Sequence, residues 1–138
     1  MRAYLYFGVN VETIEAGSMS MTWDPSTRVA VLAMAPYGTG AQAQELTGAL
    51  ERWIGNNERA FALLSDSTAG DHETADWRTV WGRFYMKHCR EGVVAGFGAS
   101  PDVQIAGALF ASGSGVRLQL FAHEPEARAW LRAQGFAA

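Results

Sequence analysis

Apolar and polar positions alternate with a period of two in the N-terminal part of the chain. Residues 4–14 are rich in β-branched and aromatic side chains, and residues 19–23 are apolar at every second position. This period predicts half-buried strands. Pro25 favours a turn before a third apolar run at 28–35. Because short segments connect these runs, we expect an antiparallel meander, with a bulge at Gly8 in its first strand.

Short apolar runs alternate with helical patterns in the C-terminal part. The runs at 61–64, 93–97 and 116–121 have the length of buried strands, and an amphipathic segment follows each of them. Buried parallel strands joined by helical crossovers produce this order. The pattern therefore predicts a single α/β domain over residues 1–138. Its mixed sheet would have about six strands, with an antiparallel N-terminal meander and parallel C-terminal strands, and about four helices.

Residues at the helix ends show where two of the helices begin. Thr39 and Gln42 form a capping box for a helix that ends at Gly55, and Ser100 with Pro101 opens a later helix. The apolar side chains at helical spacing are expected to be buried. Those expected to form the core are Leu46, Leu50, Trp53, Trp77, Trp81, Ile105, Ala106, Leu109, Phe110 and Trp130.

The composition of the chain excludes several classes of protein. The chain is 49% hydrophobic, has a net charge of −3 and contains one cysteine. It lacks a clustered basic run, so we expect no nucleic-acid partner, and a single cysteine excludes an internal disulfide. The N-terminus lacks an apolar signal core, and no apolar run is long enough to cross a bilayer. These features predict a soluble cytoplasmic protein without a transmembrane segment.

The densest polar segment is 65–74, between a predicted strand and a helix expected from about Glu73 to Arg90. Open α/β sheets bind ligands at this end of their strands, so the segment is a candidate interaction or phosphorylation loop. The candidate residues are Asp66, Ser67, Thr68, Asp71, His72 and Thr74. The alternative is that these side chains only cap loop and helix amides. His72 and its acidic neighbours do not have the spacing of metal ligands, so no metal site is predicted.

Two further candidate sites each have a structural alternative. Gly98 and Ser100 lie between a strand and a helix, where a helix N-terminus can hold an anion, but the glycine also permits close packing. Trp77, Trp81 and Tyr85 belong either to the core or to the wall of an apolar ligand cavity. The sequence contains no evident nucleophile, base and orienting group, so we predict no catalytic residues, no enzymatic activity and no cofactor.

The order of the elements and the C-terminal helix resemble a known family. The closing strand is followed by Glu126-Ala127-x-x-Trp130-Leu131, which is similar to the signature of small bacterial SpoIIAA-like proteins. These proteins have the STAS-type fold of anti-sigma-factor antagonists. The resemblance implies a non-catalytic regulatory or protein-interaction module that acts through the 66–74 loop and the adjacent helix, with a regulatory protein as its partner. A homodimer is compatible with this role.

The same resemblance allows a comparison of the 66–74 loop with the family's motif, and it suggests a second function. STAS regulators carry an Asp-Ser-Ser-Gly phosphorylation motif in this region, whereas here Asp66 matches only the acidic residue that ends the strand, and Thr74 is an imperfect substitute for the serine. Some SpoIIAA-like proteins also resemble CRAL-TRIO lipid carriers in fold. This second resemblance implies a carrier or sensor of a small apolar, lipid-like ligand, bound between the sheet and the aromatic-rich helix.

Overall fold

The computed structural model describes the backbone of residues 2–6, 9–70 and 72–138, and the side chains of residues 11–70 and 72–138. The expected bulge at Gly8 lies outside the described residues. The strands are β1 (Arg2–Tyr6), β2 (Val9–Ala16), β3 (Met19–Asp24), β4 (Val29–Ala33), β5 (Tyr37–Gly38), β6 (Phe61–Asp66), β7 (His72–Glu73), β8 (Gly92–Phe97) and β9 (Arg117–Phe121). The helices are α1 (Gly40–Ile54), α2 (Ala75–His88), α3 (Pro101–Ser114) and α4 (Glu124–Ala133).

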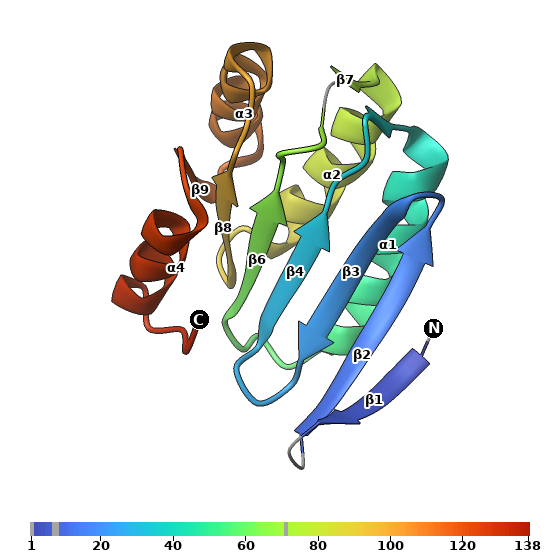
Figure 1. Cartoon of the computed structure of the whole chain (residues 1–138), viewed down its shortest axis with the longest axis vertical. Coiled ribbons are helices and arrows are strands. Elements are labelled where there is room, and N and C mark those ends of the chain that lie inside the picture. Colours follow the sequence, from blue (N-terminus) through green and yellow to red (C-terminus); the bar gives the residue numbers. More distant parts are fainter. Residues whose placement is uncertain (1, 7–8, 71) are drawn as a thin grey trace.

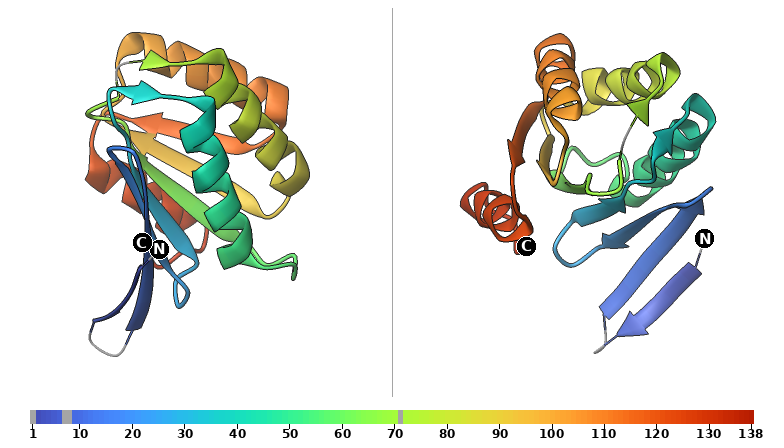
Figure 2. Two further views of the ribbon diagram at one scale, coloured as in Figure 1. Left: turned by 90° about the vertical axis from the view of Figure 1, so that its right-hand side faces the viewer. Right: turned by 45° about the horizontal axis from the view of Figure 1, so that its top comes forward.

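The main sheet is mixed and has the strand order β1-β2-β3-β4-β6-β8-β9 (Figure 1). Neighbouring strands from β1 to β4 are antiparallel, and the pairs from β4 to β9 are parallel. Helices α1, α2 and α3 lie on one face of the sheet, and α4 lies on the other (Figure 2). This arrangement confirms the predicted α/β class with an antiparallel start and a parallel end.

The N-terminal meander contains one strand more than the sequence pattern predicted. The run at 4–14 forms two antiparallel strands, with Tyr4 opposite Val11, instead of one long strand. The period-two pattern of β3 is confirmed, because Met19, Met21 and Trp23 are buried and the residues between them are half-buried. Alternation alone could not locate the reversal, since both arms of the hairpin have strand-forming residues.

The predicted helix ends are confirmed for α1 and α3. The Thr39 hydroxyl accepts a hydrogen bond from the Gln42 amide, and the Gln42 side chain accepts one from the Thr39 amide. Gly55 then ends α1 with a φ of 70°, in the left-handed region that favours glycine. The Ser100 hydroxyl caps α3 in the same way, with Pro101 in its first turn. In the described part of the chain, no helix combines the length and apolar character needed to cross a bilayer.

The parallel strands β6 and β8 are buried on both faces. Leu63 and Val94 belong to a core that also contains side chains of α1 and α2. Leu64 and Val93 belong to a second core on the opposite face, which α4 covers. Strand residues alternate between the two cores because successive side chains lie on opposite faces of a sheet.

The expected burial of α3 is wrong for two of its residues. Ile105 is 63% exposed and Leu109 is 71% exposed. This helix packs beside α2 and β9, at the edge of the sheet, and therefore has neighbours on one side only. Its apolar residues extend beyond one helical face, so their spacing did not identify the face that is buried. Phe110, in contrast, packs against the core as predicted.

The expected core position of Trp130 in α4 is also incorrect in part. Trp130 is half-buried and packs against Phe121, with ring centroids 6.2 Å apart. The fully buried residues of α4 are Ala127 and Leu131. Ala127 and Leu131 are four residues apart and face the sheet, whereas the neighbouring position 130 lies at the margin of this apolar stripe.

Candidate functional site

A cavity of about 100 Å³ lies between the sheet and helices α2 and α3. Its floor consists of β4, β6, β8 and β9, and most of its wall is apolar. The main contributors are Leu32, Leu63, Val94 and Leu118 from the sheet, Trp77, Trp81 and Tyr85 from α2, and Val103, Ala106 and Phe110 from α3. Apolar cavities with a few polar groups are the usual form of small-molecule sites.

One wall of the cavity is the aromatic ladder of α2. Trp77, Trp81 and Tyr85 are four residues apart, so they lie on one helical face. The ring centroids of Trp77 and Trp81 are 5.8 Å apart, and those of Trp81 and Tyr85 are 5.9 Å apart and nearly parallel. The three residues that the sequence offered as a candidate apolar site therefore line the same cavity.

Two polar atoms in this wall are buried without a partner. Neither the indole N–H of Trp81 nor the hydroxyl of Tyr85 has a hydrogen-bond partner among the described residues. Burial raises the pKa of the Tyr85 phenol far above its ordinary value, so the hydroxyl keeps its proton and remains a donor. Leaving a buried donor unsatisfied costs about 1–3 kcal/mol. Both atoms have almost no accessible surface, so they lie within the packed wall and are not exposed inside the cavity.

Polar side chains of β6 and the following loop add to the floor of the cavity. The Ser65 and Ser67 hydroxyls are 3.4 Å apart, and Ser67 also donates to the Met34 sulfur at 3.5 Å. Ser67 is only 4% exposed. Its hydroxyl is therefore part of the cavity wall and is shielded from solvent.

The cavity opens between α2 and α3, beside Glu73 and Arg78. The Arg78 guanidinium donates to the backbone carbonyl oxygen of Glu73 at 2.9 Å. Burial raises the pKa of the Glu73 carboxyl, and the charges of Arg78 and His72 offset part of this increase. The mouth therefore has one cation and one partly buried acid close together.

The remaining described candidates of the 66–74 loop have local structural roles or belong to other elements. The Asp66 carboxylate accepts from the Thr68 amide, and the Thr74 hydroxyl accepts from the Trp77 amide, where it caps α2. His72 is exposed in β7, which pairs with β5 in a small parallel sheet. Asp71 lies outside the described residues. Thr68 is the exposed hydroxyl among Ser67, Thr68 and Thr74.

The sequence predicted that α2 begins at about Glu73, but the helix begins at Ala75. The reason is that residues 72–73 form β7, which pairs with β5. Tyr37 lies opposite His72, and their rings meet edge to face with centroids 6.1 Å apart. Residues of two loops that are distant in sequence form this sheet. A two-residue strand has no periodicity of its own, so the sequence pattern did not reveal it.

The candidate anion site at Gly98 and Ser100 has a local structural explanation. Gly98 has a φ of 73°, and a Cβ atom at this position would lie 2.5 Å from the Thr68 hydroxyl. The Ser100 hydroxyl is occupied by the Val103 amide at 3.3 Å. These contacts support the packing and capping alternatives for both residues.

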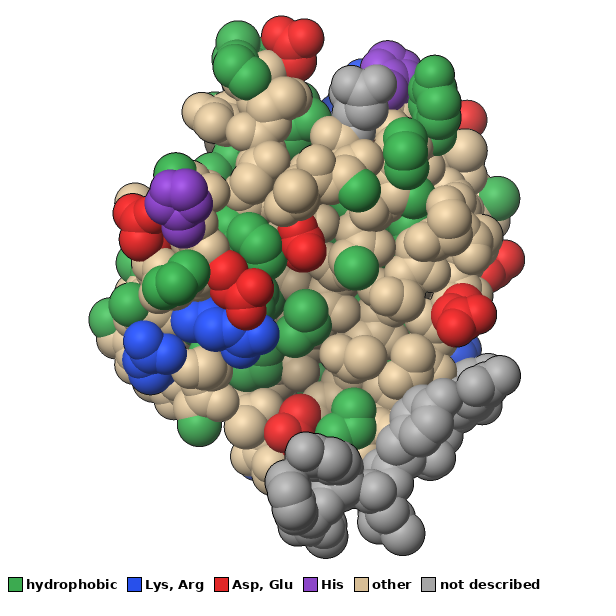
Figure 3. Space-filling view, viewed as in Figure 1, with side chains coloured by type: hydrophobic (Ala, Val, Ile, Leu, Met, Phe, Trp, Pro, Cys, Tyr) green, Lys and Arg blue, Asp and Glu red, His purple; other side chains and the backbone are tan. Residues whose placement is uncertain are grey.

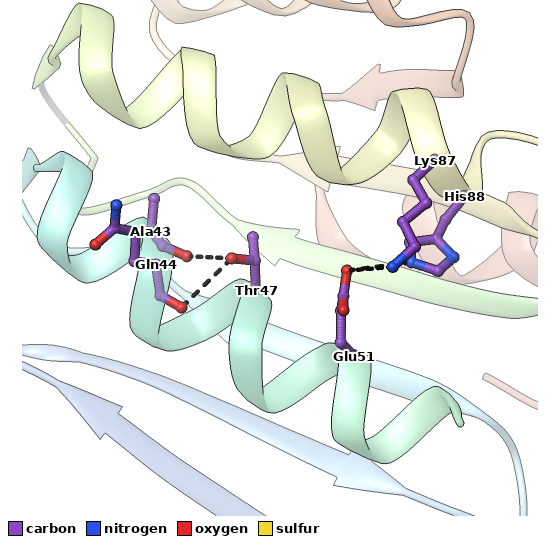
Figure 4. A network of polar contacts seen from close by, with 6 residues as sticks. All are labelled: Ala43, Gln44, Thr47, Glu51, Lys87 and His88. Atoms are coloured by element: carbon purple, nitrogen blue, oxygen red, sulfur yellow. Dashed lines mark hydrogen bonds and ion pairs between the residues drawn. The ribbon is translucent and has the colours of Figure 1, made fainter. Parts of the chain in front are cut away.

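Other polar contacts join α1 to α2 outside the cavity. The Glu51 carboxylate lies 3.4 Å from His88 Nε2 and 3.5 Å from Lys87 Nζ (Figure 4). Within α1, the Thr47 hydroxyl donates to the Ala43 carbonyl oxygen at 2.8 Å.

Across residues 11–70 and 72–138, no group of three or more His, Cys, Asp or Glu side chains is arranged to hold a metal ion.

The sequence interpretation missed a groove next to the cavity. This groove runs along α3 and is lined by Arg78, Asp102, Ile105, Ala106, Leu109 and Phe110. Arg78, Ala106 and Phe110 line both the groove and the cavity, so the two spaces adjoin. The sequence signal that could have indicated this groove is the distribution of apolar residues around α3, which extends beyond one face of the helix. A helix of this kind usually has a second apolar neighbour.

Comparison with known proteins identifies the fold. No protein-family model matches the chain, and no curated protein matches it in sequence. A solved structure of an uncharacterized DUF3478-family protein from Shewanella loihica PV-4, described as having a SpoIIAA-like fold, aligns with a TM-score of 0.62. The alignment covers 89% of this chain and 93% of the other, at 16% identity. The chain therefore has the SpoIIAA-like fold that its C-terminal signature and element order predicted.

Proposed function

We propose that this protein is a carrier or sensor of a small, mainly apolar molecule, which binds in the cavity between the sheet and helices α2 and α3. The observation that carries the proposal is the mainly apolar wall of this cavity, one side of which is the aromatic ladder of Trp77, Trp81 and Tyr85. Apolar cavities with a few polar groups are the usual form of small-molecule sites, and the polar groups here are the Ser65 and Ser67 hydroxyls in the floor and Glu73 and Arg78 at the mouth.

The size of the cavity limits the ligand. The cavity volume of about 100 Å³ is smaller than the ~150 Å³ of an engineered cavity that binds benzene. It therefore suits a short chain or part of a small ring, and a longer molecule would continue into the α3 groove. Burying about 200 Å² of apolar ligand surface contributes roughly 5 kcal/mol before the cost of association. Apolar contacts alone would give only modest affinity.

A pair of matched substitutions in α3 tests this proposal. Ala106 lines the cavity, whereas Ala108 is exposed on the same helix. We expect saturating pentane, a short apolar chain, to raise the urea unfolding midpoint of the wild type and of Ala108→Leu, because a ligand that binds only the folded state stabilises it. Ala106→Leu should lose this effect, since its larger side chain fills the cavity. Equal responses of the two variants, or no response of the wild type, would contradict the proposal.

A second candidate is the protein-interaction module that the STAS resemblance implies. Ile105 and Leu109 of α3 and Tyr37 of β5 are large apolar residues with high exposure. Figure 3 shows apolar side chains at the end of the molecule where α3 and β7 lie. Ile105 and Leu109 are four residues apart on one helix, and adjoining exposed apolar residues of this kind are typical of protein-binding surfaces. Thr68 is the exposed loop hydroxyl on which phosphorylation would regulate such binding.

Capture of one reproducible partner from the native host tests the second candidate. Leu109→Glu places a charge on the apolar surface of α3 and should abolish the capture, whereas Arg83→Glu, on an exposed position of α2, should not. An unaffected capture by Leu109→Glu would exclude this surface. Intact-mass spectra of protein from its host would show the added mass of a phosphate if the loop is modified.

A further inference from the structure

We infer that the ligand of the cavity carries an ammonium group, which pairs with the Glu73 carboxylate at the mouth while the apolar part of the ligand lies inside. This inference rests on the proposed function, because it concerns the same cavity. It adds the chemical class of the ligand, a short alkylamine in its protonated form, and the direction in which the ligand lies.

Glu73 lies where the apolar cavity meets a more polar depression. It lines the cavity, and it also lines the adjoining depression of about 130 Å³ between β7, α2 and α3. Glu73 is half-buried, and in contrast to the polar atoms of Trp81 and Tyr85 its carboxylate oxygens retain accessible surface. A molecule that occupies the cavity can therefore reach this carboxylate with a group at its outer end.

Among the described residues, no side chain pairs with the Glu73 carboxylate. Arg78 donates to the backbone carbonyl oxygen of Glu73 at 2.9 Å, and it forms no ion pair with the carboxylate. Burial raises the pKa of the Glu73 carboxyl, as expected for an acid that loses hydration without gaining a close partner. A ligand cation that approaches this carboxylate would supply the missing partner.

The charges around the depression also favour a cation over an anion. The lining contains the carboxylates of Glu73 and Asp102 and the guanidinium of Arg78, so a bound ammonium group would balance its charges. Arg78 is exposed, and solvent therefore screens its charge more than that of the half-buried Glu73. His72, also exposed, adds a positive charge only when it is protonated. An anionic head group would instead lie beside two carboxylates.

Three five-carbon probes that differ in their head group test the inference: pentylammonium, 1-pentanol and pentanoate. Their dissociation constants would be measured by NMR titration at about pH 8, where alkylamines are protonated, with the wild type and with Glu73→Gln. Glu45→Gln, at an exposed position of α1, is the matched control. We expect the wild type to bind pentylammonium about tenfold more tightly than pentanol, because a charged hydrogen bond is gained, and to bind pentanoate most weakly. Glu73→Gln should remove this preference and leave pentanol binding unchanged.

The outcomes separate this inference from the proposed function. If pentane and pentanol bind the wild type and pentylammonium binds no more tightly than pentanol, the ligand class is wrong although the cavity binds apolar molecules. A preference for pentylammonium that persists in Glu73→Gln would also overturn the inference, since another group would then hold the cation. If neither pentane nor any of the three probes binds the wild type, the proposed function fails, and the inference fails with it.

Discussion

At the scale of single residues, Arg28 joins three segments of the fold. It is 9% exposed, and its guanidinium donates to the carbonyl oxygens of Ile54 and Ala60, each at 2.9 Å. It also lies over the Trp23 ring, 5.4 Å from the centroid. Burial lowers the pKa of the guanidinium, and its φ of 57° lies in the left-handed region. These contacts fix the end of α1 against the start of β6.

Arg28→Met should destabilise the protein by about 2–4 kcal/mol, because the buried carbonyl oxygen of Ile54 and the partly buried one of Ala60 lose a charged donor. Urea unfolding followed by circular dichroism would measure the change. Arg83→Met, at an exposed position of α2, serves as the control and should change stability by no more than about 0.5 kcal/mol. Similar unfolding midpoints for the two variants would show that Arg28 does not stabilise this junction.

The stability of the folded protein should depend on pH through Glu73, which lies at the mouth of the cavity. Because burial raises the pKa of its carboxyl, the folded state keeps this proton to a higher pH than the unfolded chain does. The contribution of Glu73 to stability is therefore complete below the pKa of the unfolded state, and it is lost as the pH rises through the raised pKa. We expect Glu73→Gln to be more stable than the wild type near neutral pH.

The difference between wild type and Glu73→Gln should shrink as the pH falls, since both side chains are then neutral. Urea midpoints near neutral pH and at about pH 4 would measure it. Glu45→Gln is an exposed control on α1. A stability difference that grows on acidification would show that the Glu73 carboxyl favours the charged form in the folded protein.

At the scale of secondary-structure elements, α4 shows which residues anchor a helix to the sheet. Leu131 is fully buried against β6 and β8, whereas the larger Trp130 is half-buried beside Phe121. Leu131→Ala should therefore cost about 2–5 kcal/mol of unfolding free energy, and Trp130→Ala should cost less. Denaturant unfolding of both variants would compare the two. A greater loss for Trp130→Ala would place the indole, and not Leu131, at the centre of this contact.

Helix ends were predictable from the sequence because capping is local. The Thr39–Gln42 box and the Ser100 cap depend on residues three positions apart, and both are present in the structure. The buried face of α3 was not predictable in this way. Ile105 and Leu109 satisfy helical spacing, but which side of α3 is covered depends on the position of α2 and β9.

At the scale of the whole molecule, the sequence pattern predicted the mixed sheet but not the separate two-stranded sheet of β5 and β7. Buried apolar runs identified β6 and β8, because parallel strands between helices are apolar on both faces. The run at 116–121 also forms a strand, β9, but this strand lies at the edge of the sheet and exposes Arg117 and Gln119, so the expected burial is wrong for these two residues. The β5–β7 pair was missed, since Tyr37 and His72 meet only after two separate loops fold together. Pairings of this kind depend on tertiary contacts and leave no periodic signal in the sequence.

The candidate site was also predictable only in part. Trp77, Trp81 and Tyr85 share a helical face, so their spacing indicated a common wall. Their unpartnered polar atoms could not be predicted, because hydrogen bonding in the interior depends on which strands and helices enclose the cavity. The sequence likewise gave no sign that Ser67 is buried in the floor, since serine in a loop is usually exposed.

The central claim is that an apolar molecule binds beside the aromatic ladder of α2. The most direct test is an NMR titration with pentane that follows the indole N–H signals of the five tryptophans. We predict saturable shifts for Trp77 and Trp81, which line the cavity, and little change for Trp23, Trp53 and Trp130, which do not. Absence of saturable shifts, or the largest shift at Trp130 on the opposite face, would contradict the account.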